Sequence, residues 1–212
     1  MSAQVVTSLP LDGVGAPPFA RVDGALLSIL GVAPLALRRW LTRKPPPREV
    51  TVERRVAPEA QIGHVHLKVA DLERSVEFYE RVLGLDVTAR YGDEAAFMSY
   101  GGYHHHLGLN TWHSKGLGPA PVEAAGLYHF AIIYPSRGDL ANAVKRVLDA
   151  DWGIDGSSDH GANVSIYMHD PDHNGIELYY DRPPEEWPRD EDGNLRLLLE
   201  PLDVNALLAE AE

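Results

Sequence analysis

The 212-residue chain contains no cysteine. A disulfide, a thiolate nucleophile and a zinc site with sulfur ligands are therefore excluded. Any metal ion that the protein binds must be held by nitrogen and oxygen ligands, which histidines and carboxylates supply. The absence of cysteine indicates no particular redox compartment, because a chain without thiols is viable in all of them.

Long hydrophobic runs are missing as well. The longest uncharged apolar stretch is GALLSILGVAPLAL, residues 24–37, which contains Pro34 and is too short to span a bilayer. It has no basic segment before it and no small-residue cleavage site after it, so we read it as neither a transmembrane helix nor a signal peptide. We therefore expect no stable membrane span and a cytoplasmic protein.

Basic residues are scarce in most of the chain. The net charge is −12, but residues 1–60 carry eight Lys and Arg against five Asp and Glu, or +3, so the rest carries 11 against 26, or −15. Contacts to phosphates need clustered basic side chains, so we expect no nucleic-acid partner. The excess of carboxylates favours solubility.

The first 60 residues differ in composition from the rest of the chain. Residues 1–19 are rich in Gly, Pro, Ser and Thr and predict a disordered start. Residues 23–43 predict a helix, and the proline-rich residues 44–50 predict a stiff linker. We interpret residues 1–60 as an N-terminal extension that packs on the body or on a second subunit, with a membrane-surface helix as the alternative.

Regular secondary structure is clearest in the middle of the chain. The stretch IGHVHLKV, residues 62–69, alternates and predicts a half-buried strand whose polar face carries His64 and His66. The next stretch predicts a helix with Asp71 as its N-cap. Residues 86–112 then read as three short strands separated by glycine-marked turns.

The same order of elements recurs at an offset of 65 residues. This offset maps His64 onto His129 and Asp71 onto Ser136. Strand, helix and three strands, found twice, indicate an internal duplication. The second copy reads as a strand, a helix and a final hairpin at residues 126–135, 136–150 and 164–181.

The duplication predicts an α+β fold of paired βαβββ modules. Two such half-sheets can join into one curved mixed β-sheet, with the helices outside and a metal cavity inside. We place the modules at about residues 61–115 and 126–181, within a domain at 61–182. Residues 183–212 then form a C-terminal tail with a short helix from Asp203.

Three residues of the predicted strands indicate a metal site. His64 and His129 occupy equivalent positions in the two modules, and Glu177 lies between apolar neighbours in the last strand. A buried carboxylate is costly unless it is paired or bound to a cation. Each residue alone reads more readily as an ordinary surface or core residue. Together they form a facial triad of two histidines and one carboxylate, which suits Fe(II) or Mn(II).

The stretches HVHLKVADLERSVEFYERVLGL and HDPDHNGIELY resemble the vicinal oxygen chelate superfamily. That superfamily includes glyoxalase I, fosfomycin and bleomycin resistance proteins, and type I extradiol ring-cleaving dioxygenases. The resemblance covers about residues 60–185 and implies a metal held by His64, His129 and Glu177. It does not imply one reaction, because a shared fold does not determine function.

Three further residues resemble the extradiol branch of the superfamily. His105 begins an H-H-L-G pattern, His160 precedes a glycine in the loop before the final hairpin, and Tyr167 lies ten residues before Glu177. The resemblance implies that His160 or His105 accepts a substrate proton and later returns it. It also implies that Tyr167 donates a hydrogen bond to a substrate oxygen.

The resemblance implies an extradiol-type dioxygenase, an oxidoreductase that cleaves or oxygenates a catecholic or related aromatic substrate with O2. The expected metal is Fe(II), with Mn(II) as the alternative. The well-known extradiol enzymes have two duplicated domains, whereas this chain has one. We therefore expect the N-terminal extension or the partner in a homodimer to complete the cavity.

The run from His104 to His106 leaves alternatives open. On a strand, His104 and His106 would share one face and His105 would take the other, and the resemblance selects His105 for the pocket. A bulge beside the preceding glycines would shift this register. His66 and His106 stay open as additional site residues. The matching strand of glyoxalase I carries a second glutamate, and HHHLGLN has no carboxylate, which argues against glyoxalase I.

Two other functions stay open at this point. A non-oxidative enzyme of the superfamily, such as an isomerase, epimerase or lyase, would use the same triad with zinc, nickel or manganese. A drug-binding resistance protein would hold no metal. Oxygen consumption separates the dioxygenase from the first alternative, and bound metal separates both enzymes from the second.

Overall fold

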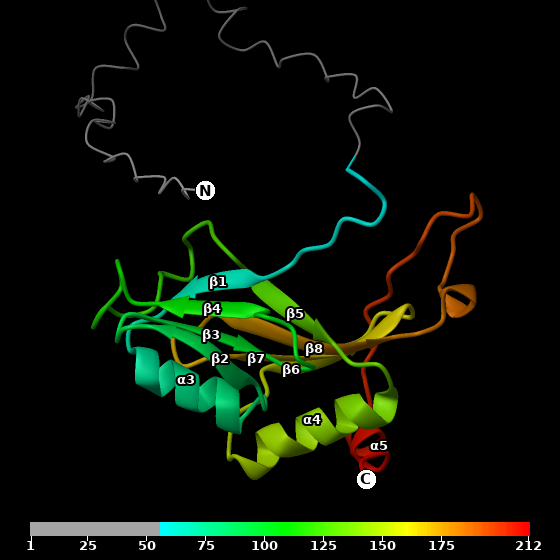
Figure 1. Cartoon of the computed structure of the whole chain (residues 1–212). Helices are drawn as coiled ribbons and strands as arrows, with labels where there is room; N and C mark the ends of the chain where they lie inside the picture. Colours follow the sequence, from blue (N-terminus) through cyan, green and yellow to red (C-terminus); the bar gives the residue numbers. More distant parts are fainter. Residues whose placement is uncertain (1–55) are drawn as a thin grey trace, which may run out of the picture. The chain divides into compact units, whose positions relative to one another are not determined.

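The computed structural model describes residues 56–212, of which residues 59–212 form one compact unit (Figure 1). The helix predicted at 23–43 and the linker predicted at 44–50 lie outside the described residues. Within the part of the chain that is described, no helix is long and apolar enough to cross a membrane.

The first module consists of one helix and four strands. Its sheet has the order β1-β4-β3-β2, in which β1 and β4 are parallel and the other neighbours are antiparallel. This is the predicted order of elements. In sequence they are β1 (Val65–Lys68), α3 (Leu72–Arg81), β2 (Asp86–Tyr91), β3 (Ala95–Ser99) and β4 (Leu107–Asn110).

Helix α3 begins and ends where its sequence predicts. Asp71 caps the first turn, because its carboxylate accepts a hydrogen bond from the N–H of Arg74 at 3.1 Å. At the other end the N–H of Leu85 donates to the carbonyl of Tyr79 at 3.0 Å, and Gly84 adopts a φ of 75°. This left-handed turn favours glycine and stops the helix.

The second module repeats the pattern with the sheet order β5-β8-β7-β6, in which β5 and β8 are parallel. The strand predicted at 126–135 is shorter in the structure. The sequence did not locate β6, because its residues Gly-Ser-Ser-Asp show no apolar alternation. The elements are β5 (His129–Ile133), α4 (Arg137–Asp149), β6 (Gly156–Asp159), β7 (Asn163–His169) and β8 (Gly175–Asp181).

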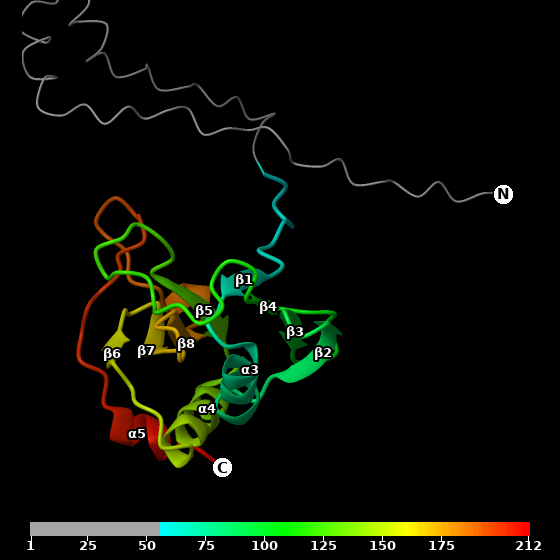
Figure 2. The same cartoon turned by 90° about the vertical axis from the view of Figure 1, so that its left-hand side faces the viewer.

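The paired-module α+β fold is confirmed, with one difference in how the sheets meet. Residues 56–212 contain two four-stranded sheets that are separate in their hydrogen bonding, rather than one continuous curved sheet. Figure 2 shows the sheets side by side, with β1 and β5 nearest each other and with α3 and α4 on one side of both. Side-chain packing, and not strand pairing, joins the modules.

One hydrophobic core serves both modules. It is formed by one face of each sheet together with the apolar sides of α3 and α4. Complete burial of a large apolar side chain stabilises the fold by about 1.5–3 kcal/mol, so this shared core holds the modules together. The largest fully buried side chains come from both modules: Tyr79, Met98, Leu109, Leu140, Ile166, Met168, Ile176, Leu178 and Leu207.

The turn between β7 and β8 also connects the modules. The buried hydroxyl of Tyr79 donates a hydrogen bond to the carboxylate of Asp170 at 2.9 Å. Burial and the charge of Asp170 raise the pKa of Tyr79 well above its usual value. Asp172 accepts hydrogen bonds from the N–H of Ala70 at 3.1 Å and from the guanidinium of Arg74 at 2.6 Å. The residues of this turn therefore also position α3.

The tail after β8 is an ordered part of the body. It contains a short 3-10 helix, η2 (Pro184–Glu186), and a final helix, α5 (Val204–Leu208). Helix α5 begins after Asp203, the residue expected to start it, and its Leu207 is fully buried in the shared core. Between the two helices lies an extended segment, residues 187–200, which we call the strap.

Candidate active site

Those predicted site residues that belong to strands, His129, Tyr167 and Glu177, lie on the helix-free face of the second sheet. In β8, Ile176 and Leu178 point into the core, so alternation places Glu177 on the opposite face. In β1, Leu67 points into the core, so His64 and His66 lie on the helix-free face. The site residues are therefore separated from the core by the sheets themselves.

His129 and Glu177 lie together on neighbouring strands. Nε2 of His129 is 3.0 Å from Oε2 of Glu177, which is only 9 % exposed. Gly175 lies opposite His129 in the β5–β8 ladder, and a Cβ at residue 175 would come within 2.1 Å of the carbonyl oxygen of Tyr128. Glycine is therefore required for the close approach of these two strands.

This pair suits a divalent metal ion. Two ligands that bind one ion at right angles, with bonds of about 2.1 Å, lie roughly 3 Å apart. The separation of 3.0 Å between His129 and Glu177 fits that spacing. One imidazole nitrogen and one carboxylate oxygen are ligands that Fe(II) and Mn(II) accept.

Tyr167 and His160 extend the pair into a chain of hydrogen bonds. Tyr167 lies directly opposite Glu177 in the β7–β8 ladder. Its hydroxyl is 3.2 Å from Oε1 of Glu177 and 2.8 Å from Nε2 of His160. Burial, together with the charge of Glu177, raises the pKa of Tyr167, so its hydroxyl stays protonated at neutral pH. The tyrosine can therefore donate a hydrogen bond within the site.

His64 does not join this group. It is exposed, and the ring centroid of His105 lies 4.6 Å from that of His64. Residues 56–212 contain no group of three or more His, Cys, Asp or Glu side chains placed to hold one metal ion. Two of the three predicted ligands are thus together, and the third lies with His105 in a second cluster on the first module.

The three consecutive histidines of this second cluster are not on a strand. Strand β4 begins at Leu107, and residues 104–106 lie in the loop before it. Gly101 and Gly102, with φ values of 64° and 78°, turn the chain and delay the start of the strand. The predicted alternation of these histidines between two strand faces is therefore wrong.

Each of the three histidines has its own surroundings. Nδ1 of His104 lies 2.7 Å from Nδ1 of His105, so one of the two rings must donate to the other. Nδ1 of His106 lies 2.8 Å from the hydroxyl of Ser99, and the His106 ring stacks on Tyr100. Burial, and next the neighbouring His104, lower the pKa of both His105 and His106. Both rings are therefore mostly neutral at pH 7.

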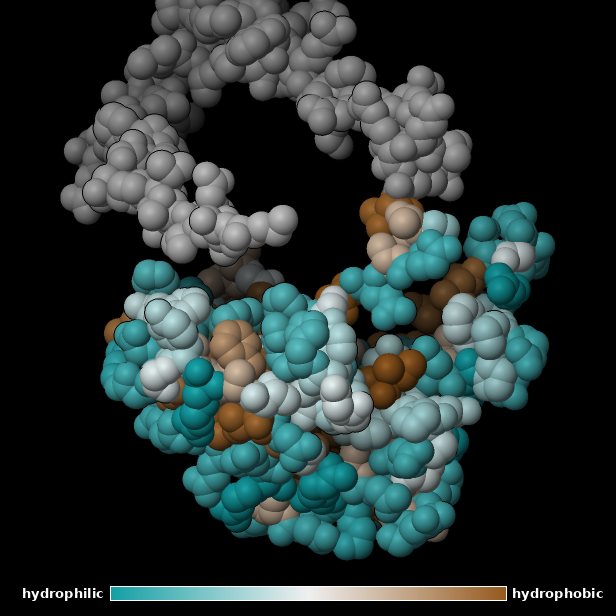
Figure 3. All heavy atoms as spheres, viewed as in Figure 1, coloured by the Kyte–Doolittle hydropathy of each residue, from teal (hydrophilic) through white to brown (hydrophobic). Residues whose placement is uncertain are grey.

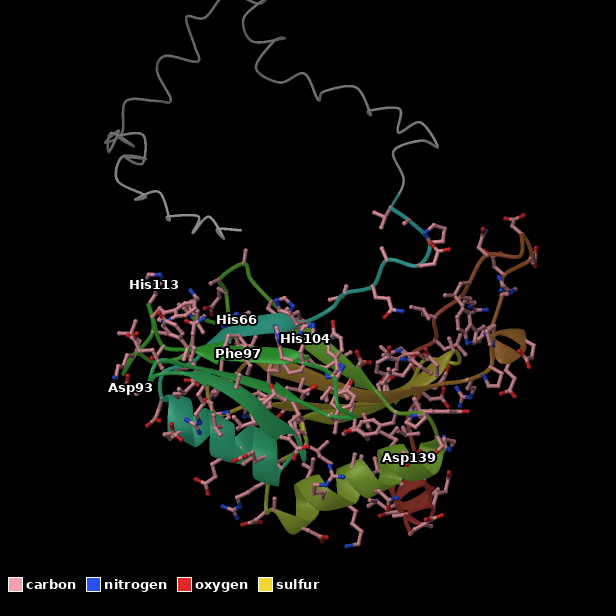
Figure 4. All side chains as sticks on the ribbon, viewed as in Figure 1. His66, Asp93, Phe97, His104, His113 and Asp139 are labelled. Carbon is pink, nitrogen blue, oxygen red and sulfur yellow. The ribbon has the colours of Figure 1, made fainter. Side chains whose placement is uncertain are left out.

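His66 also belongs to this second cluster. Figure 4 shows His66, Phe97 and His104 close together over β1 and β4. A Cβ at Gly108 would lie 2.8 Å from Cγ of His66, so the glycine of the H-H-L-G pattern makes room for the His66 ring. The sequence could not show this, because Gly108 and His66 meet only across the β1–β4 ladder.

A hollow of about 270 Å³ lies at the carboxyl ends of β5 and β8. None of its lining residues was predicted to belong to the site. Burial, and next the charge of Glu177, raise the pKa of Asp181 in its wall, so the hollow is electrostatically coupled to the candidate site. Its lining consists of Ile133, Tyr134, Pro135, Tyr180 and Asp181.

The sequence also did not reveal the residues that surround His160. Nδ1 of His160 lies 2.8 Å from the carbonyl oxygen of Leu198 in the strap. The carboxylate of the adjacent Asp159 accepts two hydrogen bonds from the guanidinium of Arg182, at 2.8 and 2.7 Å. The sequence could not identify Leu198 as a partner of His160, because the contact is made by a backbone atom. The basic residue Arg182 directly after the final strand was a sign in the sequence of this ion pair.

Comparisons with known proteins identify the family of the chain. The family model described as Glyoxalase/Bleomycin resistance protein/Dioxygenase superfamily matches residues 61–178. Catechol-2,3-dioxygenase of Bacillus subtilis (strain 168) is 37% identical over 153 residues, which are 72% of this chain and 53% of that protein. Biphenyl-2,3-diol 1,2-dioxygenase 3 of Rhodococcus globerulus is 30% identical over 129 residues, which are 59% of this chain and 67% of that protein. The chain thus spans about half the length of the Bacillus protein.

A solved structure supports the fold. The glyoxylase/bleomycin resistance protein/dioxygenase domain from Frankia sp. EAN1pec matches with a TM-score of 0.52 and 22% identity, over 59% of this chain and 94% of that one. The family match covers more than half of the chain and includes both modules. The chain therefore belongs to the Glyoxalase/Bleomycin resistance protein/Dioxygenase superfamily.

Proposed function

We propose that the protein is an extradiol-type dioxygenase that cleaves a catecholic ring with O2. The observation that carries this proposal is the group formed by His129, Glu177, Tyr167 and His160. In this group a histidine–carboxylate pair with the spacing of two metal ligands adjoins a tyrosine and a histidine that can carry protons. The names of the relatives, a catechol dioxygenase and a biphenyl-diol dioxygenase, favour the same reaction class.

In this proposal His129 and Glu177 hold a divalent metal, with Fe(II) as the first choice and Mn(II) as the second. When bound, such an ion offers open positions to both oxygens of a diol and to O2. His64 is the proposed third ligand. Because it lies in the cluster of the other module, the helix-free faces of the two sheets must approach each other for His64 to reach the pair.

The protein's own groups would handle the substrate protons. A neutral imidazole accepts a proton near pH 7, and His160 presents Nε2 toward Tyr167 and Glu177. The protonated Tyr167 hydroxyl can donate to a substrate oxygen. His105 remains a second proposed acid–base residue, because its ring lies beside that of His64.

Oxygen uptake tests the proposal. Protein loaded with Fe(II) without oxygen would be challenged with catechol, methylcatechols and biphenyl-2,3-diol, and metal content would be measured in the same samples. We expect uptake by the wild type, and loss of both uptake and bound metal in Glu177→Gln. Glu123→Gln, which changes an exposed carboxylate, is the matched control. Bound metal without uptake on any diol would instead favour a non-oxidative enzyme.

We also propose a homodimer. Several apolar side chains before β1 and before β5 remain exposed: Ile62 is 91%, Val122 95%, Leu127 54% and Tyr128 90% exposed. Figure 3 shows such apolar spots as brown areas on a mainly hydrophilic surface. Exposed apolar patches often mark interaction surfaces. Light scattering after gel filtration should give twice the mass of the chain, and a fully active monomer would contradict the proposal.

A further inference from the structure

His160 is held through both of its ring nitrogens. Nδ1 lies 2.8 Å from the carbonyl oxygen of Leu198, and Nε2 lies 2.8 Å from the hydroxyl of Tyr167. A carbonyl oxygen can only accept a hydrogen bond, so Nδ1 must carry the hydrogen. In the neutral ring, Nε2 then holds the free electron pair.

This tautomer sets the direction of the hydrogen-bond chain. Tyr167 has one hydroxyl hydrogen, and an unprotonated Nε2 of His160 at 2.8 Å accepts it better than Oε1 of Glu177 at 3.2 Å. With the hydrogen on Nε2 instead, His160 would donate to Tyr167, and the tyrosine would donate to Glu177. The Leu198 carbonyl therefore leaves the Glu177 carboxylate free to act as a ligand.

Backbone hydrogen bonds of the strap hold the Leu198 carbonyl in place. The N–H of Leu198 donates to the carbonyl of His160 at 2.9 Å, so residues 160 and 198 exchange hydrogen bonds in both directions. Asp159 and Glu200 exchange two further backbone hydrogen bonds, at 2.9 and 3.0 Å. The strap therefore pairs with the residues at the end of β6 that carry the histidine.

Side-chain packing brings the strap and the His160 loop into close contact. Gly161 adopts a φ of 77°, and a Cβ there would lie 2.4 Å from Cγ of Pro188 and 3.1 Å from Cδ1 of Leu198. The indole N–H of Trp187 donates to the carbonyl of Arg182 at 2.7 Å. Arg182 in turn donates to the carbonyl of Gly161 at 2.8 Å, so one arginine holds both segments.

We infer that the strap is a positioning element of the site: the carbonyl of Leu198 fixes His160 as the Nδ1–H tautomer and aims its basic Nε2 at Tyr167. The consequence for catalysis rests on the proposed function, because only a ring with an unprotonated Nε2 can take a substrate proton at that place. The tautomer itself depends neither on a bound metal nor on a substrate.

The tautomer can be measured directly in the full-length chain. Two-bond proton–nitrogen spectra of protein labelled with ¹⁵N-histidine distinguish the two tautomers, and the loss of one signal in His160→Gln assigns the residue. We expect Nδ1–H in the wild type. In Gly161→Ala, where the new methyl group must displace Pro188, we expect a shift toward the Nε2–H form. Gly153→Ala is the control, because a Cβ there meets nothing within 4 Å.

Any side chain strains the left-handed backbone at residue 161, so Gly161→Ala alone could fail to fold. A second variant therefore tests the inference independently. Trp187→Phe keeps an aromatic ring but removes the indole N–H that anchors the strap, and it should give a smaller shift in the same direction. Leu198→Ala keeps the carbonyl and should leave the Nδ1–H form in place. An Nε2–H signal from wild-type His160, or an unchanged tautomer in both strap variants, would overturn the inference.

Activity measurements connect the tautomer to the reaction. With an active diol, Gly161→Ala should lower kcat by about tenfold or more at unchanged metal content, as expected for a misplaced acid–base group. Combined with His160→Gln, it should cause no further loss, because both changes act on the same group. If the proposed function fails, no oxygen is taken up although the Nδ1–H signal of His160 is present. If the strap inference fails, the Nδ1–H signal itself is missing or does not respond to the strap variants.

Discussion

The Tyr167 hydroxyl has one hydrogen and two neighbours that can accept it, His160 at 2.8 Å and Glu177 at 3.2 Å. Replacing the tyrosine by phenylalanine removes this hydrogen and leaves the ring in place. A hydrogen bond of this kind that strengthens in the transition state is worth roughly 1.5–3 kcal/mol. The proposed function therefore assigns a central role to this single hydroxyl group.

We predict that Tyr167→Phe lowers kcat for catechol cleavage by about tenfold to a hundredfold. This factor is the loss in rate that corresponds to the roughly 1.5–3 kcal/mol of the lost hydrogen bond. Metal content should stay as in the wild type, because the hydroxyl is not a proposed ligand. Oxygen uptake and metal analysis on one preparation test both statements. Tyr91→Phe, which changes an exposed tyrosine, is the control. Full activity of Tyr167→Phe would remove the tyrosine from the mechanism.

Gly108 supports a second prediction at the residue scale. A methyl group there would meet the His66 ring at 2.8 Å, so Gly108→Ala should destabilise the protein by about 1–3 kcal/mol through overpacking. Removal of the imidazole ring in the double variant His66→Ala/Gly108→Ala should recover most of the lost stability. Urea unfolding of the single and double variants measures the coupling. Strictly additive effects would show that the two residues do not interact.

At the scale of elements, the β7–β8 turn acts as the connector of the modules, since Asp170 within it accepts a hydrogen bond from Tyr79 of α3. Loss of a buried hydrogen bond to a charged group costs about 1.5–3 kcal/mol. We predict a decrease of that size in the free energy of unfolding for Tyr79→Phe, with urea denaturation as the measurement. An unchanged unfolding midpoint would mean that the Tyr79–Asp170 hydrogen bond does not contribute to joining α3 to the turn.

The pairing of Asp159 with Arg182 predicts a dependence of stability on pH. Hydrogen bonds from the Arg182 guanidinium lower the pKa of Asp159 in the folded protein. Stability from this pair is therefore fully present above the unfolded pKa, about 3.9, and is lost as the pH falls through the lowered folded value. We expect Asp159→Asn to be less stable than the wild type at neutral pH and to lose less stability below about pH 4. Chemical denaturation at several pH values tests this expectation, and parallel curves for the two proteins would contradict it.

The elements with regular patterns could be predicted from the sequence, and those formed by long-range contacts could not. Helix α3 has its cap, its apolar spacing and its glycine stop within a short stretch, and Tyr167 meets Glu177 because the turn between them is local. Strand β6 pairs locally with β7 but shows no apolar alternation, and the strap depends on partners far along the chain. The separation of His64 from His129 depends on how two sheets pack, which no spacing within one strand encodes.

At the scale of the whole molecule, charge opposes the compact state. Residues 61–212 carry a net −15 at pH 7, since they contain 11 Lys and Arg against 26 Asp and Glu. Like charges crowded on one body repel each other, and salt screens this repulsion. The core shared by the two modules must overcome this repulsion.

We therefore predict that the protein is more stable at high salt. Between about 0.01 M and 1 M sodium chloride the Debye length falls from roughly 30 Å to 3 Å. The melting temperature at pH 7 should rise by about 2–4 °C, which corresponds to roughly 1 kcal/mol for a chain of this size. Near pH 5.2, where the net charge vanishes, circular dichroism melts should show little dependence on salt. A melting temperature that falls with salt at pH 7 would mean that ion pairs dominate instead.

The strap also bears on the order in which the protein matures during synthesis. Chains emerge from the ribosome from the N-terminal end, and domains fold as they emerge. A nascent chain that has emerged only as far as β8 already contains His129, Tyr167 and Glu177, yet it lacks the carbonyl of Leu198 that orients His160. The strands of both modules can thus have emerged before His160, the proposed base, is oriented. If the proposed roles hold, an unfinished chain would contain His129 and Glu177 before His160 is held in its orientation.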